Sequence, residues 1–588
     1  MNTIASENKA DKAGPASIAQ RLTVGHAVLL AIVIAAAIMR FTALGAGALS
    51  PDEAQRALDV WRFWQPGEAP PAFDVSPAYF SLSVLLFPLL GDSDAVARLI
   101  PALAGVALAA LPWLARERLG TVGALTTSLL LAVSPTASII SVTAGGDALA
   151  LAATLLLLVA WLRYQNSGEL HWLQVTAGAL GLGLASSPLF YSALATMLAA
   201  WMLQTKLGET PAASDSPSPD GQPLHRSVLI PAAASGGVVF LLLATLFLWR
   251  PTGLGAAATL LAQWLADFTL QGSVSLLLAP FLALGRYELI VVVLGAAAIF
   301  WASWRGRPLP LFLVFWFSAA ILVILLQRGV AENVLLLVLP AYLLIGMAFD
   351  AAFRRPATLS AAGTFVALLV LGAIVYFNGA RYLRVLIHAP EQLSLLFLAL
   401  LAIVFAIVLI NFVRSWDETA ALQGSAAALL VLFLIFNWGT AWWLTHEARN
   451  DPREQWVGIT SDDDVLLLAK TLEDVSWQVD GSRYGMALHS GVDHQVLRWY
   501  LRHFKNASFG VIVRPESQQP AIISAGDSEP ALGADYMGSD YRLLVGVDPQ
   551  TPASGLAETL RWWFFREHPA SMQAEQLILW VRSDVLPR

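Results

Sequence analysis

The chain has 588 residues, of which 57% are hydrophobic and only 13% are charged, and its formal net charge is -7. Soluble domains carry about 25% charged residues, so this composition excludes an ordinary soluble protein and indicates one that lies mostly in a lipid bilayer. The chain has no cysteine, which excludes disulfides, thiolate catalysis and cysteine-ligated metal centres. It has no basic stripe, so we expect no nucleic-acid partner.

Residues 1–23 are polar and are predicted to form a disordered cytoplasmic tail. A transmembrane region is predicted at 24–447, because apolar runs long enough to cross a bilayer recur along it. Hydropathy predicts about thirteen spans in this region. They are 24–45, 95–115, 122–142, 146–163, 171–186, 188–204, 227–249, 287–304, 310–327, 332–353, 359–378, 393–413 and 421–444.

Lysine and arginine are more frequent in the loops on the side of the N-terminus than in the loops on the other side. Because positively charged loops stay in the cytoplasm, the N-terminus is predicted to lie inside and the C-terminal region outside. The first outer loop, 46–94, includes an apolar stretch at 78–90 that is too short to span and is predicted to form an interfacial or re-entrant helix. The inner linker 205–226 is rich in Pro, Ser and Asp and is predicted to be disordered.

Residues 448–588 have the composition of a soluble domain. A helical pattern follows the acidic run at 462–464, and four later segments read as strands: FGVIV, AIISAG, YRLLVGVD and LILWVRSD. The predicted fold class is therefore a mainly α, polytopic membrane protein with a C-terminal extracytoplasmic α/β domain.

An acidic pair, Asp52 and Glu53, follows the first predicted span. One interpretation is a helix start, with Ser50 as the N-cap, Pro51 at the first position and the acidic pair facing the positive end of the helix dipole. The other interpretation is chemical, because a carboxylate beside a bilayer is costly unless it is solvated or used. Such a group could deprotonate an acceptor hydroxyl or bind a divalent cation. Both interpretations can hold together.

Three further charged residues are candidates for the same site. Asp147 begins a span on the next outer turn and is either an N-cap or a second acidic group beside the cavity of Asp52. Arg98 lies inside the second span and needs an anionic partner, which could be a lipid phosphate or Asp94 on the same helix face. Arg328 lies at the predicted outer interface, where it could bind phosphate or extend towards water.

The histidines form no metal cluster in the sequence, and His489 and His494 with Asp493 are only weak evidence for a metal. No cofactor is therefore assigned. A divalent cation at Asp52 and Asp147 stays open, and with no cysteine in the chain it would have oxygen ligands.

The order of these features resembles the GT-C superfamily of integral-membrane glycosyltransferases, and within it the protein mannosyltransferase and aminoarabinose-transferase branch. The resemblance is clearest in the first third of the chain. The stretch 91–120 looks closest to a prokaryotic subgroup labelled flippase-activity-associated proteins, whose members also carry segments like 497–502. The matching features are one helix followed by 51–54, a loop with 77–79, then 91–94, 97–103, 115–120, 131–135 and Asp147.

This resemblance implies an enzyme of the EC 2.4 class in the plasma membrane of a prokaryote, working on the cell envelope. It would transfer a sugar from a polyprenyl-phosphate donor to a protein, lipid or glycan acceptor at the outer face. Asp52 matches the first acidic motif and is the expected general base, with Glu53 assisting or orienting it. Asp147 matches the second acidic motif, and Arg98 matches the arginine that meets the carrier phosphate. The implied mechanism is a single displacement with inversion.

The sequence also departs from the family pattern. Residues 145–148 read Gly-Gly-Asp-Ala where the subgroup more often has an Arg-Asn-Asp-like run, and 328–333 lacks the Lys-rich or aromatic pattern of some relatives. An alternative function is therefore a non-catalytic, polyprenyl-phosphate-binding protein associated with a flippase. A secondary transporter is disfavoured, because the sequence shows no inverted repeat with broken helices in matching halves.

Overall fold

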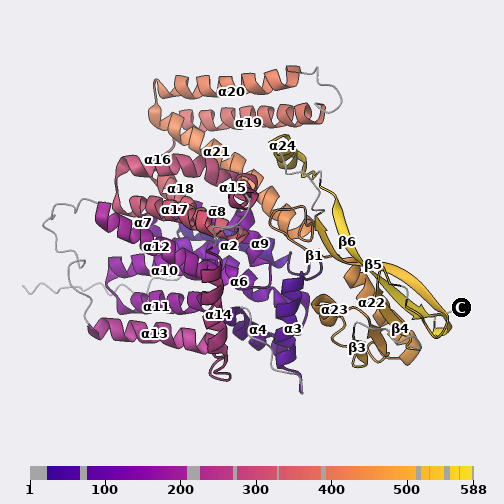
Figure 1. Ribbon diagram of the computed structural model, residues 1–588. Helices are drawn as coiled ribbons and strands as arrows, with labels where there is room; N and C mark the ends of the chain where they lie inside the picture. Colours follow the sequence, from indigo (N-terminus) through magenta and orange to yellow (C-terminus); the bar gives the residue numbers. More distant parts are fainter. Residues whose placement is uncertain are drawn as a thin grey trace, which may run out of the picture.

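The structure is a computed structural model that describes residues 23–66, 76–207, 226–268, 274–327, 330–385, 393–510, 518–528, 530–547, 556–568 and 570–585. The predicted tail 1–23, apart from its last residue, most of the linker 205–226, and Arg328 lie outside the described residues. Helices make up the larger part of the molecule, and one mixed β-sheet lies near the C-terminus (Figure 1). The predicted fold class is confirmed: the chain is a multi-pass membrane protein with a C-terminal domain of strands and helices.

Each predicted span coincides with helix in the structure. The helices of this region are α2 (Val24–Phe41), α3 (Pro51–Phe63), α4 (Pro77–Leu90), α5 (Asp94–Ala97), α6 (Leu99–Ala110), η1 (Leu111–Ala115), α7 (Arg116–Leu119), α8 (Thr121–Val133), α9 (Pro135–Ser141), α10 (Asp147–Ser167), α11 (Leu170–Leu184), α12 (Pro188–Leu207), α13 (Arg226–Ala244), α14 (Gly253–Ala266), α15 (Val274–Tyr287), η3 (Val291–Gly295), α16 (Ala296–Arg305), α17 (Pro308–Leu326), η4 (Ala331–Val334), α18 (Leu335–Ala352), α19 (Leu359–Val385), α20 (Leu393–Arg414), α21 (Glu418–Trp442) and η5 (Trp443–Glu447).

Fewer helices can cross a bilayer than hydropathy alone predicts. Among the described residues, eight helices are long and apolar enough, or up to ten if each of two bent helix pairs counts as one span. The prediction of about thirteen is larger because hydropathy does not measure helix length. Helix α11, for example, has 15 residues and is therefore about 22 Å long, which is shorter than a hydrocarbon core of roughly 30 Å.

The two bent pairs meet at a buried carboxylate. Helices α8 and α9 are bent by 59°, and the segment containing α15 is bent by 100° against the one containing α16. Glu288 lies at the second break and accepts hydrogen bonds from the Ser134 hydroxyl at 2.6 Å, and from the Thr136 hydroxyl and N–H at 2.6 and 3.1 Å. Irregular backbone at membrane depth needs such internal partners, so each break helps to satisfy the polar groups of the other.

The C-terminal part contains a six-stranded mixed sheet in the order β1-β5-β6-β4-β2-β3. Buried residues alternate along β6 at Leu577, Leu579 and Val581, as expected for a strand with one face against a core. The predicted strand segments AIISAG, YRLLVGVD and LILWVRSD correspond to β4, β5 and β6, and the start of FGVIV to the end of β3. The elements are β1 (Thr460–Ser461), α22 (Asp464–Asp480), β2 (Leu488–Ser490), α23 (Gln495–Tyr500), β3 (Ala507–Phe509), β4 (Ala521–Ala525), β5 (Tyr536–Val547), α24 (Leu556–Phe565), β6 (Met572–Arg582) and η6 (Ser583–Val585).

Helix α23 attaches this sheet to the helical region close to α3 (Figure 1). The Asp94 carboxylate accepts hydrogen bonds from Trp499 Nε1 at 2.7 Å and from the Tyr500 hydroxyl at 2.8 Å. The same Tyr500 oxygen accepts the backbone N–H of Leu49 at 2.8 Å. The C-terminal domain therefore holds both the start of α5 and the segment that leads into α3.

We expect replacement of Asp94 by alanine to loosen this attachment. The change removes two hydrogen bonds to a charged acceptor, each worth about 1.5–3 kcal/mol. The variant should unfold at a lower temperature and be cleaved faster by a protease between the helical region and the sheet. The control is Asp540→Ala, at an exposed position of β5, and a variant at Asp94 that melts and is cleaved like this control would contradict the attachment.

Candidate active site

The acidic pair lies in the first turn of α3, and the two carboxylates have different surroundings. Ser50 is the N-cap: its hydroxyl accepts the Glu53 N–H at 3.4 Å, and its own N–H donates to Glu53 Oε2 at 3.1 Å. This reciprocal pair forms a capping box, with Pro51 at the first helical position. Asp52 is exposed, whereas Glu53 is 3% exposed. The helix-start interpretation is therefore correct, and only Asp52 faces solvent.

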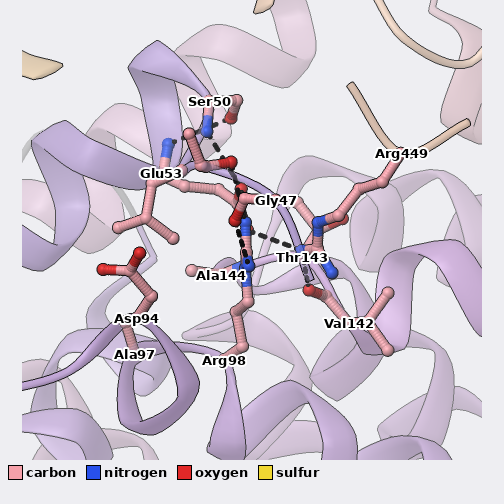
Figure 2. Close-up of polar contacts among 12 residues, drawn as sticks. Gly47, Ser50, Glu53, Asp94, Ala97, Arg98, Val142, Thr143, Ala144 and Arg449 are labelled. Carbon is pink, nitrogen blue, oxygen red and sulfur yellow. Dashed lines mark hydrogen bonds and ion pairs between the residues drawn. The ribbon is translucent and has the colours of Figure 1, made fainter. Parts of the chain in front are cut away.

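Glu53 is held by two arginines from distant parts of the chain (Figure 2). Arg98 donates from Nε to Oε1 at 3.0 Å and from Nη2 to Oε2 at 2.9 Å, and Arg449 donates to Oε1 at 3.2 Å. The N–H of Ala144 also donates to Oε1 at 2.8 Å. Burial alone would raise the pKa of Glu53, but the two guanidinium groups outweigh it and hold the pKa well below its usual range. Glu53 is thus an ionised, fully engaged carboxylate.

Arg98 uses all of its donors inside the protein. The side chain is fully buried, and besides Glu53 it donates to the carbonyl oxygens of Leu44, Ala46, Gly47 and Ala48 at 3.0 to 3.3 Å. A guanidinium has five N–H groups, and these contacts occupy all of them. The alternative partner considered from the sequence, Asp94, instead accepts from α23. This geometry leaves no donor for a carrier phosphate, so that role of Arg98 is not retained.

Asp147 lines a polar cavity of ≈ 330 Å³. The cavity is walled by the start of α10, the 186–189 turn, α14 and the segment before α18. Arg56 of α3 lies in its wall and donates to the Ala144 carbonyl at 2.8 Å. Asp267 and Glu332 also line it. Arg328 lies outside the described residues, although Gln327 and Val330 on either side of it line the same cavity.

Asp52 lies next to this cavity without forming part of its wall. It precedes Arg56 by four residues on α3, so the two side chains share a helix face and are separated by about 6 Å along the helix axis. Arg98 lies elsewhere, in the contacts around Glu53. The expectation that Asp52, Asp147 and Arg98 line one cavity is thus wrong: Asp147 lines it, Asp52 lies near it, and Arg98 is buried outside it.

Two residues of α3 bind the same residue of the loop before α10. Glu53 accepts the N–H of Ala144 at 2.8 Å, and Arg56 donates to the carbonyl oxygen of Ala144 at 2.8 Å. The loop is therefore fixed to α3 three residues before Asp147. Arg56 and Arg449 had no assigned role in the sequence. The four-residue spacing from Asp52 to Arg56 could have indicated that Arg56 lies on the same helix face as Asp52, whereas no local pattern could indicate Arg449.

No metal centre is evident in the part of the chain that the structure describes, since no three His, Asp or Glu side chains there are placed to hold an ion. A divalent cation at Asp52 and Asp147 stays a prediction. In the C-terminal domain, His489 contacts the Ser508 hydroxyl at 2.8 Å, and Asp493 pairs with Arg498.

Residues 74–216 match the family model described as dolichyl-phosphate-mannose-protein mannosyltransferase. Among solved structures, the chain is similar to ArnT from Cupriavidus metallidurans bound to undecaprenyl phosphate, with a TM-score of 0.53 and 16% identity over 95% of this chain and 99% of that chain. It is also similar to the apo state of the same protein (TM-score 0.48, 17% identity, 82% and 85% covered). The archaeal oligosaccharyltransferase AglB from Archaeoglobus fulgidus matches more weakly (TM-score 0.42, 13% identity, 82% and 64% covered). No curated protein matches significantly.

The fold is similar to that of the GT-C membrane proteins. Residues 74–216, which are less than half of the chain, are similar in sequence to a family of protein mannosyltransferases, enzymes of the EC 2.4 class. These matches do not reach the flippase-activity-associated subgroup, which stays a prediction.

Loss of charge should lower the stability of the protein strongly at Glu53 and hardly at all at Asp52. Glu53→Gln leaves Arg98 and Arg449 without their counter-ion, and breaking a buried ion pair in this way costs about 3–5 kcal/mol. Asp52→Asn changes an exposed side chain, for which effects stay within about 0.5 kcal/mol. Thermal unfolding of the purified variants measures both. Equal melting temperatures for Glu53→Gln and the unchanged protein would contradict the role of Glu53 as a structural anchor.

Proposed function

We propose that the protein transfers a sugar from a polyprenyl-phosphate carrier to a hydroxyl of a protein, lipid or glycan acceptor, with Asp52 as the general base. The observation that carries this proposal is the contrast within the acidic pair. The Glu53 carboxylate accepts hydrogen bonds from Arg98, Arg449 and the Ala144 N–H. Asp52, in contrast, is exposed at the N-terminus of the helix that Glu53 fixes. The turn that carries Asp52 is thus fixed through Glu53, while the Asp52 side chain stays accessible.

The proposed reaction is a single displacement. Asp52 accepts the proton of the acceptor hydroxyl, and the oxygen attacks the anomeric carbon of the donor sugar. The bond between that carbon and the carrier phosphate oxygen breaks, and the polyprenyl phosphate leaves with the electron pair. Attack from the face opposite the phosphate inverts the anomeric centre. Asp147 acts from the cavity wall, orienting the sugar or a cation beside it, and Glu53 is a positioning residue rather than a catalytic one.

The same proposal places Asp52, the cavity and the C-terminal sheet at the outer face of a prokaryotic plasma membrane, with the N-terminus in the cytoplasm. The support is the distribution of lysine and arginine among the loops. The runner-up function is a protein that binds the polyprenyl phosphate beside a flippase without transferring sugar, and it needs the same orientation.

Removal of the Asp52 carboxylate should slow transfer strongly without unfolding the protein. General-base catalysis contributes about 10²- to 10⁴-fold, so Asp52→Asn should lower kcat by that factor. The assay uses purified protein with polyprenyl phosphates that carry different sugars, and records sugar transfer and hydrolysis. The matched control is Glu418→Gln, which changes an exposed carboxylate at the first residue of α21.

Two outcomes would count against the proposal. If the unchanged protein neither transfers nor hydrolyses any donor of a broad panel, the enzyme proposal fails and the carrier-binding function is favoured. If Asp52→Asn is as active as Glu418→Gln, the transfer function stands but the base assignment fails.

The orientation can be tested cleanly because the chain has no cysteine of its own. Lys505→Cys places one thiol at an exposed position of the C-terminal domain, and Ser415→Cys places one just after α20. In intact cells, a membrane-impermeant maleimide should label the first variant and reach the second only after lysis. The reverse labelling pattern would show that the predicted topology is inverted.

A further inference from the structure

A second cavity, of ≈ 770 Å³, lies at the opposite end of the helices from Asp147. Helix α18 begins beside the cavity of Asp147 and ends at this one, where the ends of α16 and α20 and the start of α21 complete the wall. Four arginines from three separate segments line it: Arg305, Arg354, Arg355 and Arg414. The distribution of lysine and arginine among the loops predicts that this end faces the cytoplasm. We call it the basic cavity.

The charge of the basic cavity is not balanced by the protein. Glu418 is the single acidic side chain among the described residues of the wall, and it pairs with Arg414 at 3.4 Å. In the described ranges, no ion pair or side-chain hydrogen bond includes Arg305, Arg354 or Arg355. The part of the chain that the structure describes thus leaves these three guanidinium groups without a counter-ion.

Membrane topology alone does not account for this arrangement. Arginines are expected in cytoplasmic loops, but topology does not require that Arg305 and the pair Arg354 and Arg355, which belong to different loops, meet at one cavity. Like charges that are brought together repel, so their shared position is unfavourable unless an anion enters. The convergence of the three side chains is therefore the observation that points to a ligand.

The loop that carries two of these arginines is fixed in place. Gln423 of α21 is buried, and its Nε2 donates to the carbonyl oxygens of Ala352 at 3.0 Å and of Arg355 at 2.9 Å. The backbone on both sides of Arg354 therefore has a defined position relative to α21. A site whose backbone is already ordered loses less conformational freedom when a ligand binds.

The basic cavity also has an apolar side. Ile410 of α20 and Leu422 of α21 line it, and Leu422 is exposed. Helix α20 packs chiefly on α19 and α21, at the edge of the molecule (Figure 1), and carries further exposed apolar side chains such as Phe405 and Phe412. A soluble anion would leave this apolar surface uncovered, whereas a lipid with an anionic headgroup matches both sides of the cavity.

We infer that the basic cavity binds an anionic phospholipid of the cytoplasmic leaflet, with its phosphate on Arg305, Arg354 and Arg355 and its acyl chains along α20 and α21. Guanidinium groups donate paired hydrogen bonds to phosphate oxygens, and basic pockets between transmembrane helices on the cytoplasmic side bind such headgroups. The bound lipid joins α20 and α21 to the ends of α16 and α18. It should therefore stabilise the folded protein, whether or not the protein transfers a sugar.

The test measures the melting temperature of the full-length protein in detergent while phosphatidylglycerol, phosphatidylcholine with the same acyl chains, or inorganic phosphate is added. A ligand that binds only the folded state raises the melting temperature, so phosphatidylglycerol should raise it at concentrations at least about tenfold below those at which phosphatidylcholine acts. Equal effects of the two lipids would overturn the inference. An equal effect of inorganic phosphate would assign the cavity to a soluble anion and would also overturn it.

Arg305→Gln and Arg307→Gln form a matched pair of variants. Both side chains are exposed and lie two residues apart, but only Arg305 lines the basic cavity. Because each arginine near an anionic headgroup contributes about 1 kcal/mol, Arg305→Gln should raise the phosphatidylglycerol concentration needed for half of the stabilisation by about fivefold. Arg307→Gln should leave it unchanged. Equal responses of the two variants would contradict the assigned site.

The double variant Arg354→Gln/Arg355→Gln separates lipid binding from a role in the fold. It removes two charges that lack a counter-ion, so without added lipid it should melt no lower than the unchanged protein. It should need at least about tenfold more phosphatidylglycerol for the same stabilisation. A double variant that melts at a lower temperature without lipid, and responds to phosphatidylglycerol like the unchanged protein, would show that these arginines serve the fold alone.

Discussion

The buried carboxylate of Glu53 is the interaction on which the arrangement of the site depends. It joins α3 to the segment before α6 through Arg98, to the segment after η5 through Arg449, and to the loop before α10 through Ala144. A charge removed from water is tolerated only when its partners are in place. These four parts of the chain must therefore come together as one unit, and loss of any partner leaves a buried charge exposed to an apolar environment.

Because of this requirement, the two adjacent acidic residues, Glu53 and Asp52, have different environments. A carboxylate that accepts from two arginines and a backbone N–H is a poor base, because its pKa lies well below the usual range. Its neighbour Asp52 keeps solvent access at the helix N-terminus. The chain thus uses one carboxylate to fix the helix and leaves the other exposed, which is the arrangement that the proposed base at Asp52 requires.

Local sequence patterns predicted the features that depend on neighbouring residues. Apolar length gave the helices, and the Ser-Pro-Asp-Glu order gave the capped start of α3, because both arise within a few residues. The partner of Glu53 could not be predicted in this way, since Arg449 lies 396 residues further along the chain. For Arg98, helical spacing suggested Asp94 as the partner. In the folded protein Asp94 instead accepts hydrogen bonds from Trp499 and Tyr500, and Arg98 donates to Glu53.

The Gly-Gly-Asp-Ala run, which departs from the family pattern, follows from the same packing. A Cβ at Gly146 would lie 2.1 Å from the Ser186 carbonyl oxygen, and one at Gly145 would lie 2.9 Å from Arg56 Nη1. At Gly146, only glycine allows the loop to approach the backbone at Ser186 this closely, whereas at Gly145 the end of the Arg56 side chain could shift. Because Glu53 and Arg56 hold the two ends of Ala144, the loop carries Asp147 to the cavity at a fixed position relative to Asp52. The departure is therefore a condition for placing the second acidic residue beside the helix of the first.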